Sequence, residues 1–190
     1  IITLGEVAEA RSRETGHHVK RVAEYAAILA REVGLHEDQI RLLKMACPMH
    51  DIGKLAIPDA ILNKPASLDE EEMAIIKTHT QAGYDMLKTS GRPLMRLAAQ
   101  IALEHHEKYD GSGYPLGKKG NDISIEGRIV AIADVYDALG NDRVYKKAWP
   151  QEDIVKFFKE VRGTWFDPLL CDIFIQKMPD MQLIGEKYPD

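Results

Sequence analysis

Histidines and carboxylates occur together at several points in this chain, and their spacing is its strongest chemical signal. Of the 7 histidines, His50 is followed directly by Asp51, and His105 is followed directly by His106. Each of these doublets is expected at the end of a helix. Asp134 lies within an otherwise apolar helical stretch. Burying a carboxylate without a partner costs several kcal/mol, so Asp134 requires a cation or strong hydrogen-bond donors.

Other residues extend this pattern toward a metal site. His18 follows Glu14 by four residues, which places both side chains on one face of a helix. His79 is expected in the turn after another helix. Imidazole and carboxylate ligands suit iron, manganese, cobalt, nickel or zinc, and no thiolate is needed. Two ions about 3.5–4 Å apart, bridged by one aspartate, would clamp the attacking and leaving oxygens of a phosphate diester.

The elements that position these residues are predicted to be helices. Apolar residues recur with helical spacing along most of the chain, which predicts an all-α fold. The segment 129–132 could form a short strand, but the length of its flanks favours a helix. A glycine-rich loop is expected at 107–122. The expected helices cover 19–33, a stretch starting near Asp38 and bent at Pro48, a stretch capped by Ser67 and Glu70, 94–106, 125–139, 151–161 and 167–177.

Composition limits the classes of partner and compartment. The 190 residues, 45% of them hydrophobic, suit one globular domain. A net charge of -5 without a long basic run argues against a nucleic-acid polymer as partner. Cys47 and Cys171 show no metal or disulfide spacing and predict free thiols in the cytoplasm. No apolar run reaches the roughly 18 residues that a membrane span needs.

Two motifs resemble a known enzyme family. The run HDIGK at 50–54 resembles the signature of the HD superfamily of metal-dependent phosphohydrolases. The run HHEKYDGSGYP at 105–115 resembles the HHExxDGxGYP loop of the HD-GYP family. An HD pair alone is a weak signal, whereas the eleven-residue loop is specific. Further matches follow in family order from about Glu14 to Pro168, so the resemblance covers most of the chain.

The resemblance implies an activity and a fold. Residues 1–190 would form a single globular helical bundle of the HD-domain type that hydrolyses cyclic di-GMP to pGpG or GMP by attack of a metal-bound hydroxide. Two or three divalent transition-metal ions are implied, iron being preferred over manganese, and the third depends on Glu14. Position by position, the implied metal ligands are Glu14, His18, His50, Asp51, His79, His105, His106 and Asp134.

The same resemblance implies the residues that handle substrate. Lys54 and Asp51 are the implied catalytic residues, and Gly113, Tyr114 and Pro115 form the loop at the site. Two cations that follow the helix of Asp134, Arg143 and Lys146, would bind phosphate. The sequence departs from the common family pattern at Val144, where many members have proline, and at Trp165, where many have histidine.

Two rival functions remain beside this one. The first is an HD hydrolase acting on another nucleotide or cyclic nucleotide. The second is a sensor that binds cyclic di-GMP without turnover, against which the complete ligand set argues. Residues 1–13 resemble the tail of a helix from an upstream part, so we expect a fragment of a longer regulatory protein with an N-terminal domain. A homodimer is compatible with this arrangement.

Residues close to the motifs have simpler predicted roles. His17 is expected to face solvent, because it lies about 100° around the helix from His18. Cys47 is expected to pack in the core. Glu107 and Asp110 could accept hydrogen bonds from ligand histidines, and Glu107 could instead be solvated at the surface.

Overall fold

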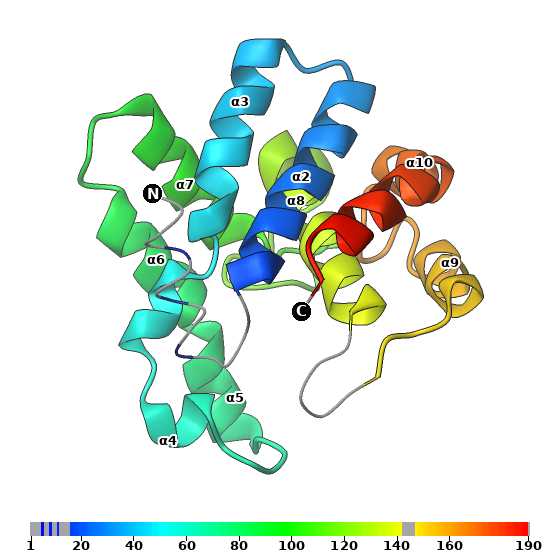
Figure 1. The fold of residues 1–190 in the computed structure, drawn as a ribbon. Helices are drawn as coiled ribbons and strands as arrows, with labels where there is room; N and C mark the ends of the chain where they lie inside the picture. Colours follow the sequence, from blue (N-terminus) through cyan, green and yellow to red (C-terminus); the bar gives the residue numbers. More distant parts are fainter. Residues whose placement is uncertain (1–4, 6–7, 9–10, 12–15, 142–146, 190) are drawn as a thin grey trace.

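The computed structural model describes Gly5, Ala8, Arg11 and residues 16–141 and 147–189 (Figure 1). Its helices are α2 (Gly16–Glu32), α3 (Glu37–Ala46), α4 (Asp59–Leu62), α5 (Glu70–Lys77), α6 (His79–Leu87), α7 (Pro93–Glu104), α8 (Ile125–Gly140), α9 (Gln151–Glu160) and α10 (Pro168–Lys187). Three 3-10 turns are η1 (Cys47–Met49), η2 (Ile52–Ala56) and η3 (Gly120–Asp122). Over these described residues no strand forms, and the predicted all-α fold is confirmed.

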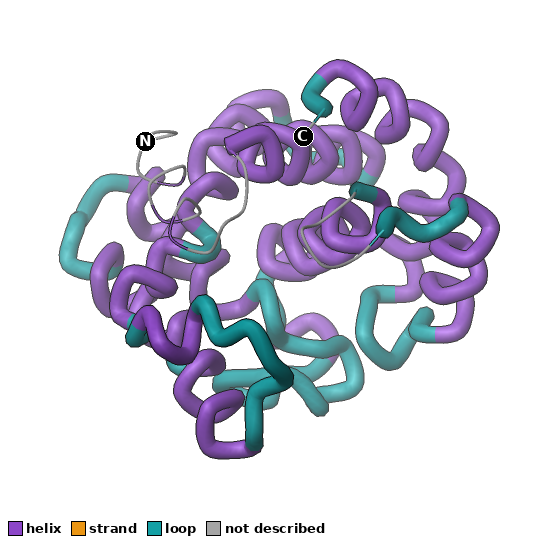
Figure 2. The backbone as a smooth tube through the Cα atoms, turned by 60° about the horizontal axis from the view of Figure 1, so that its bottom comes forward, coloured by secondary structure: helices purple, strands orange, loops and turns teal. Residues whose placement is uncertain are grey.

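Helices α2 and α8 form the centre of the bundle. Helix α2 packs against α3, α8 and α10, while α7 packs against α3, α6 and α8 (Figures 1 and 2). Their contact faces are fully buried, as at Ala26 and Leu29 of α2 and Ile129 and Ile132 of α8. The alanines that recur along α2 allow the neighbouring backbones to approach closely, so this helix can be enclosed on several sides.

Most predicted helices are confirmed, and three details are wrong. His79 is the first residue of α6 and does not lie in the predicted turn. The segment 129–132 is helical within α8. The capping box before α5 uses Asp69 and Glu72, not Ser67 and Glu70, because Asp69 accepts from the Glu72 amide while Glu72 reaches back to the Asp69 amide. The last helix continues ten residues beyond the predicted end at position 177, through Pro179 to Lys187.

Two 3-10 turns follow α3 on either side of His50 and Asp51. Pro48 lies inside η1, which follows α3 directly, so the predicted bend takes the form of a 3-10 turn. His50 and Asp51 then lie between η1 and η2. In the part of the chain that the structure describes, no helix has the length and apolar character to cross a membrane.

Candidate metal centre

Two groups of potential metal ligands form inside the bundle. In each group, one ligand atom from every member lies within 4.8 Å of those of the others. The first group contains Asp51, His79, His105 and His106. The second contains His18, His50 and Asp134. Seven of the eight predicted ligands are therefore brought together from five separate segments of the chain. The eighth, Glu14, lies outside the described residues.

The carboxylate of Asp51 lies between the two groups. Its Oδ1 atom is 3.1 Å from Nε2 of His79 and 3.6 Å from Nε2 of His105, both in the first group. Its Oδ2 atom is 3.3 Å from Nε2 of His50, which belongs to the second group. Each oxygen therefore faces a different set of histidines, which is the arrangement needed for one carboxylate to bridge two ions.

The second group closes around the other aspartate. Oδ1 of Asp134 lies 3.6 Å from Nε2 of His18 and 3.8 Å from Nε2 of His50. Its side chain is 17% exposed, so this carboxylate lies at the edge of the cluster and not deep inside it. Helix α8 thus supplies an acidic ligand from one side, while α2 and the segment after η1 supply the histidines.

Backbone carbonyls fix the orientation of the histidine rings. The Nδ1 atoms of His50, His79 and His105 lie 3.0, 2.7 and 3.0 Å from carbonyl oxygens three residues earlier. A carbonyl can only accept, so each Nδ1 carries a proton and each ring turns its Nε2 atom into the cluster. This is the usual way in which a protein prepares histidine for a metal ion.

Protonation states in the first group also suit a cation. Burial alone would raise the pKa of Asp51, but Lys54 and His50 hold that pKa well below its usual range, so the carboxylate is charged. Burial lowers the pKa of His105, and it lowers that of His106 well below the usual value, so both imidazoles are neutral. Uncharged ligand nitrogens beside a charged carboxylate match the requirements of a divalent ion.

The close approach of these acceptor atoms favours a cation. Nε2 of His79 lies 3.4 Å from Nε2 of His105 and 3.1 Å from Asp51 Oδ1. With the Nδ1 protons committed to carbonyls, lone pairs face lone pairs at these distances, which is unfavourable unless a positive charge lies between them. The residues of this buried cluster therefore fit divalent metal ions.

An ion-pair network that the sequence did not predict holds His18. Asp137 is 1% exposed, and its Oδ2 lies 2.8 Å from Nδ1 of His18. Arg21 donates to the same carboxylate through Nε at 2.7 Å and Nη2 at 2.9 Å. Asn141 donates to its other oxygen at 3.0 Å. The available signal was spacing, because Arg21 and Asp137 each follow a predicted ligand, His18 and Asp134, by one helical turn.

Lys54 lies directly beside the first group. Its Nζ atom is 2.7 Å from Oδ2 of Asp51. The turn η2 that carries Lys54 packs tightly against the start of α6, because a Cβ at Gly53 would lie only 1.8 Å from the carbonyl oxygen of His79. Glycine at this position therefore brings Lys54, Asp51 and His79 into one site.

The 105–115 loop covers one side of the cluster. The ring of Tyr114 stacks on that of His106, with centroids 4.8 Å apart, and Nζ of Lys77 lies 5.2 Å from the centroid of the Tyr114 ring. Glu107 accepts from the amides of Leu116 and Lys118 at 2.7 and 3.0 Å. These bonds hold the loop, and Glu107 is buried, so the alternative of a solvated surface residue is wrong.

Other contacts of the loop clarify residues near it. Asp110 accepts from the amide and hydroxyl of Ser112 at 2.8 and 2.7 Å, so it shapes the turn. Gly113 is required for close approach, since a Cβ there would lie 2.2 Å from the amide nitrogen of Lys108. The carbonyl oxygen of Trp165 accepts a hydrogen bond from the amide of Tyr109 at 3.0 Å. The centroid of its ring lies 3.6 Å from Nζ of Lys108.

Trp165 therefore anchors the base of the loop, a role that its sequence position did not reveal. His17 is exposed and Cys47 is buried, as predicted. The predicted phosphate-binding residues Arg143 and Lys146, and the departure at Val144, lie outside the described residues.

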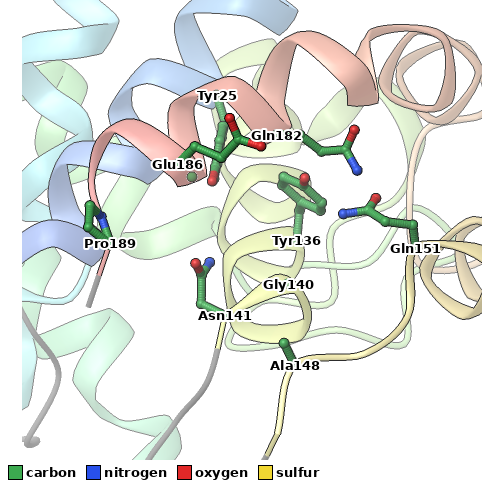
Figure 3. Close-up of a pocket in the computed structure, with 10 residues that line it drawn as sticks. Tyr25, Tyr136, Gly140, Asn141, Ala148, Gln151, Gln182, Glu186 and Pro189 are labelled. Atoms are coloured by element: carbon green, nitrogen blue, oxygen red, sulfur yellow. The ribbon is translucent and has the colours of Figure 1, made fainter.

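A cavity of about 460 Å³ lies on another part of the bundle, among α2, α8 and α10 (Figure 3). Tyr25, Tyr136, Asn141 and Gln151 are among its lining residues. None of the seven clustered ligands lines it. The metal-binding geometry and this cavity are separate features.

The chain is similar to a known protein family and to known enzymes. The family model described as an HD domain matches residues 3–170. The 3'3'-cGAMP-specific phosphodiesterase 2 of Vibrio cholerae is 47% identical over 190 residues, which cover 100% of this chain and 36% of that protein. The cyclic di-GMP phosphodiesterase response regulator RpfG of Xanthomonas campestris pv. campestris is 41% identical over 181 residues, 95% of this chain and 48% of that protein. The chain thus spans less than half the length of either relative.

Solved structures share the architecture. A cyclic GMP-AMP specific phosphodiesterase of Vibrio cholerae aligns with a TM-score of 0.68 at 16% identity, covering 97% of this chain and 50% of that one. The HD domain of the Listeria monocytogenes phosphodiesterase PgpH, in complex with cyclic di-AMP, aligns with a TM-score of 0.62 at 19% identity, covering 98% and 97%. At these identities the likeness shows the fold alone.

Proposed function

This chain belongs to the HD domain family, and on that premise we propose that it hydrolyses a phosphodiester bond of a cyclic dinucleotide, with cyclic di-GMP as substrate. The observation that carries the proposal is the position of Asp51, whose two oxygens face two different groups of histidines at 3.1 and 3.3 Å. That geometry suits a pair of ions acting on one phosphate. The names of relatives at 41% identity also support cyclic di-GMP.

The proposed ligands divide between two ions. Asp51, His79, His105 and His106 would hold one, and His18, His50 and Asp134 the other, with Asp51 shared. Such ions would offset negative charge on the phosphate oxygens. They would also lower the pKa of a bound water molecule toward neutral pH. We assign iron to the site, with manganese as the alternative, because imidazole and carboxylate suit both. Glu14 would bring a third ion, so Glu14→Ala should lose about one ion per chain.

Lys54 has the clearest catalytic role among the residues that are not ligands. Its ammonium group lies 2.7 Å from Asp51 Oδ2, beside the place where a phosphate bridging the two groups would bind. From there it can offset charge on a non-bridging oxygen and donate a proton to the leaving 3'-oxygen. The face of Tyr114 and the glycine-rich loop at 111–113 would border the same substrate. Arg143 and Lys146 would bind the second phosphate of the cyclic dinucleotide.

A second substrate is favoured by a specific observation. The relative that is 47% identical over 190 residues is named for specificity toward 3'3'-cGAMP. This molecule shares the two phosphodiesters of cyclic di-GMP and differs at one base, so the same metal groups could cleave both. Discrimination between them would depend on contacts to that base and not on the histidines.

The setting of the domain is also proposed. The relatives are two to three times longer than the aligned segment, which spans 36% and 48% of them. We propose that residues 1–190 act as an output domain of a cytoplasmic signalling protein controlled by an N-terminal regulatory domain. A native gene product that begins at or near Ile1 would contradict that arrangement.

The test uses protein purified without air. Elemental analysis gives the identity and number of ions, and chromatography of products gives turnover of cyclic di-GMP, 3'3'-cGAMP and other nucleotides. We expect at least two ions per chain and hydrolysis of cyclic di-GMP. Tight binding of cyclic di-GMP with no product would support the rival sensor function, and turnover of unrelated nucleotides alone would support the other rival.

A further inference from the structure

Gly5 and Arg11 lie against the two turns that flank His50 and Asp51. A Cβ at Gly5 would lie 2.1 Å from the carbonyl oxygen of Pro48 in η1. Ala8 is 1% exposed and belongs to the hydrophobic core. Arg11 reaches η2 and the residues just after it. Gly5 and Arg11 thus lie against the backbone on both sides of Asp51.

Arg11 makes an unusually complete set of bonds with this turn. Its Nη1 atom donates to the carbonyl oxygen of Leu55 at 2.7 Å and approaches that of Lys54 at 3.4 Å. Its Nη2 atom donates to the carbonyl oxygen of Ile57 at 3.2 Å and to Asp59 Oδ1 at 2.6 Å. A planar guanidinium can hold several acceptors in one fixed geometry, which a lysine ammonium cannot reproduce.

Besides its packing on α6, the turn depends on backbone hydrogen bonds for its shape. It is a five-residue 3-10 helix, with backbone bonds from the Lys54 amide to Asp51 at 2.9 Å and from the Ile57 amide to Lys54 at 3.1 Å. Such helices have poorer hydrogen-bond geometry than α-helices, and their last carbonyls need donors from elsewhere. Arg11 supplies donors to the carbonyl oxygens at this end of η2.

The shape of η2 determines where the catalytic candidate lies. Lys54 is in the middle of the turn, and its Nζ atom is 2.7 Å from Asp51 Oδ2. A shift of the turn by an ångström would move the ammonium away from the carboxylate and from any bound phosphate. Displacements of that size can reduce turnover strongly without removing a reacting group.

We propose that Arg11 is a positioning residue, which fixes η2 so that Lys54 stays beside Asp51 and turnover is kept high. Arg11 belongs to neither group of clustered ligands, so its effect would pass through the turn and not through metal contact. The catalytic part of this inference rests on the proposed function. The structural part, that Arg11 orders residues 51–59, does not.

A simpler reading is a surface ion pair with Asp59. The Arg11 and Asp59 side chains are 31% and 74% exposed, and exposed pairs of this kind contribute little. Asp59→Asn removes only the ion pair and leaves the carbonyl contacts, whereas Arg11→Ala removes both. The two variants therefore separate the ion pair from the clamp on the turn.

The first measurement is hydrogen exchange of the metal-free and metal-loaded chain. Arg11→Ala should raise amide exchange in peptides covering 51–59 by at least about tenfold, while peptides from α7 remain unchanged. Asp59→Asn should leave exchange near the wild-type rate. Arg31→Ala is the matched control, because Arg31 also forms an exposed pair, with Glu37 at 3.5 Å, far along α2 from the site.

The second measurement is turnover with metal content determined on the same sample. Arg11→Ala should lower kcat about tenfold or more, with KM within about twofold of wild type and metal content unchanged. Millimolar guanidinium should restore part of the lost kcat, since it can occupy the same carbonyls. Arg11→Lys, which keeps the charge without the planar fork, should resemble the alanine variant and carries the test if Arg11→Ala does not fold.

The results separate this inference from the proposed function. Wild-type exchange and wild-type kcat in both Arg11 variants would overturn it. Loss of metal in proportion to kcat would also overturn it, because Arg11 would then support the ligands or the fold. If the wild-type chain cleaves no cyclic dinucleotide but Arg11→Ala still loosens 51–59, the proposed function fails while the clamp on the turn stands.

Discussion

His18 and Asp137 are joined by a hydrogen bond of 2.8 Å between Nδ1 and Oδ2, across 119 positions of sequence. Because the carboxylate holds Nδ1, the Nε2 atom of His18 is directed toward Asp134, at 3.6 Å from its Oδ1. The same carboxylate neutralises the buried guanidinium of Arg21. Asp137 therefore has two roles: it pairs with the buried charge of Arg21 and it orients the ring of His18.

Replacing this carboxylate by its amide should weaken the second metal group. In Asp137→Asn, His18 loses a charged acceptor, and we expect metal affinity in that group to fall about 10–100-fold. Arg21 loses its charged partner as well, so the free energy of unfolding should fall by about 1–3 kcal/mol. Metal titration and thermal unfolding measure the two effects. Asp38→Asn, at an exposed position of α3, should change neither.

Asp51 should matter more than His50, although the two residues are adjacent. Asp51 faces both groups, whereas His50 belongs to only one. Asp51→Asn should therefore remove at least one ion and lower turnover by more than about 10³-fold, while His50→Ala should leave the Asp51, His79, His105 and His106 group able to bind an ion. Elemental analysis beside kinetics tests this order, and wild-type turnover in Asp51→Asn would contradict the mechanism.

The sequence predicted the local parts of this site better than the long-range ones. His50 and Asp51 are neighbours, and the 105–115 loop is a continuous motif, so both were visible without a fold. The bond between His18 and Asp137 depends on how α2 packs against α8, which periodicity along one helix does not specify. The contacts of Arg11 were hidden for the same reason, because its acceptors are backbone atoms more than 40 positions away.

Element ends show a similar limit. The capping box of α5 was displaced by two residues because Ser67 and Glu70 fit the same pattern as Asp69 and Glu72, and local sequence does not decide between them. Helix α10 extends past Pro179, although proline usually ends a helix. Met178 and Met181 on either side of this proline are buried, so tertiary packing outweighs the local preference.

Acid should destabilise the metal-free chain. Burial lowers the pKa of His105 and His106 from the usual 6.5, so the folded state stays unprotonated while the unfolded chain takes up protons below that pH. The unfolded state then binds more protons, and stability that is present above about pH 6.5 is lost as pH falls. Thermal unfolding between pH 7.5 and 5 should show a falling Tm. His106→Gln should reduce the slope, whereas an unchanged slope would place the acid response elsewhere.

A single methyl group at Gly53 should damage the site more than one at a comparable glycine elsewhere. A Cβ at Gly53 would lie 1.8 Å from the His79 carbonyl oxygen and 2.5 Å from the Gly83 amide nitrogen. Both are backbone atoms, so η2 or the start of α6 must move, and Lys54 and His79 would move with them. Gly53→Ala should therefore lower the free energy of unfolding by about 1–3 kcal/mol and reduce both metal binding and turnover.

Gly91 provides the matched control for this change. A Cβ there meets no atom within 4 Å, and its backbone is not in the left-handed region. Gly91→Ala should leave metal content and turnover at the wild-type level and change stability by no more than about 1 kcal/mol. Denaturant unfolding, elemental analysis and kinetics measure the stability, metal content and turnover of the two variants, which differ only in where the methyl group is added. Equal behaviour of both variants would mean that close packing of η2 on α6 does not hold the metal centre together.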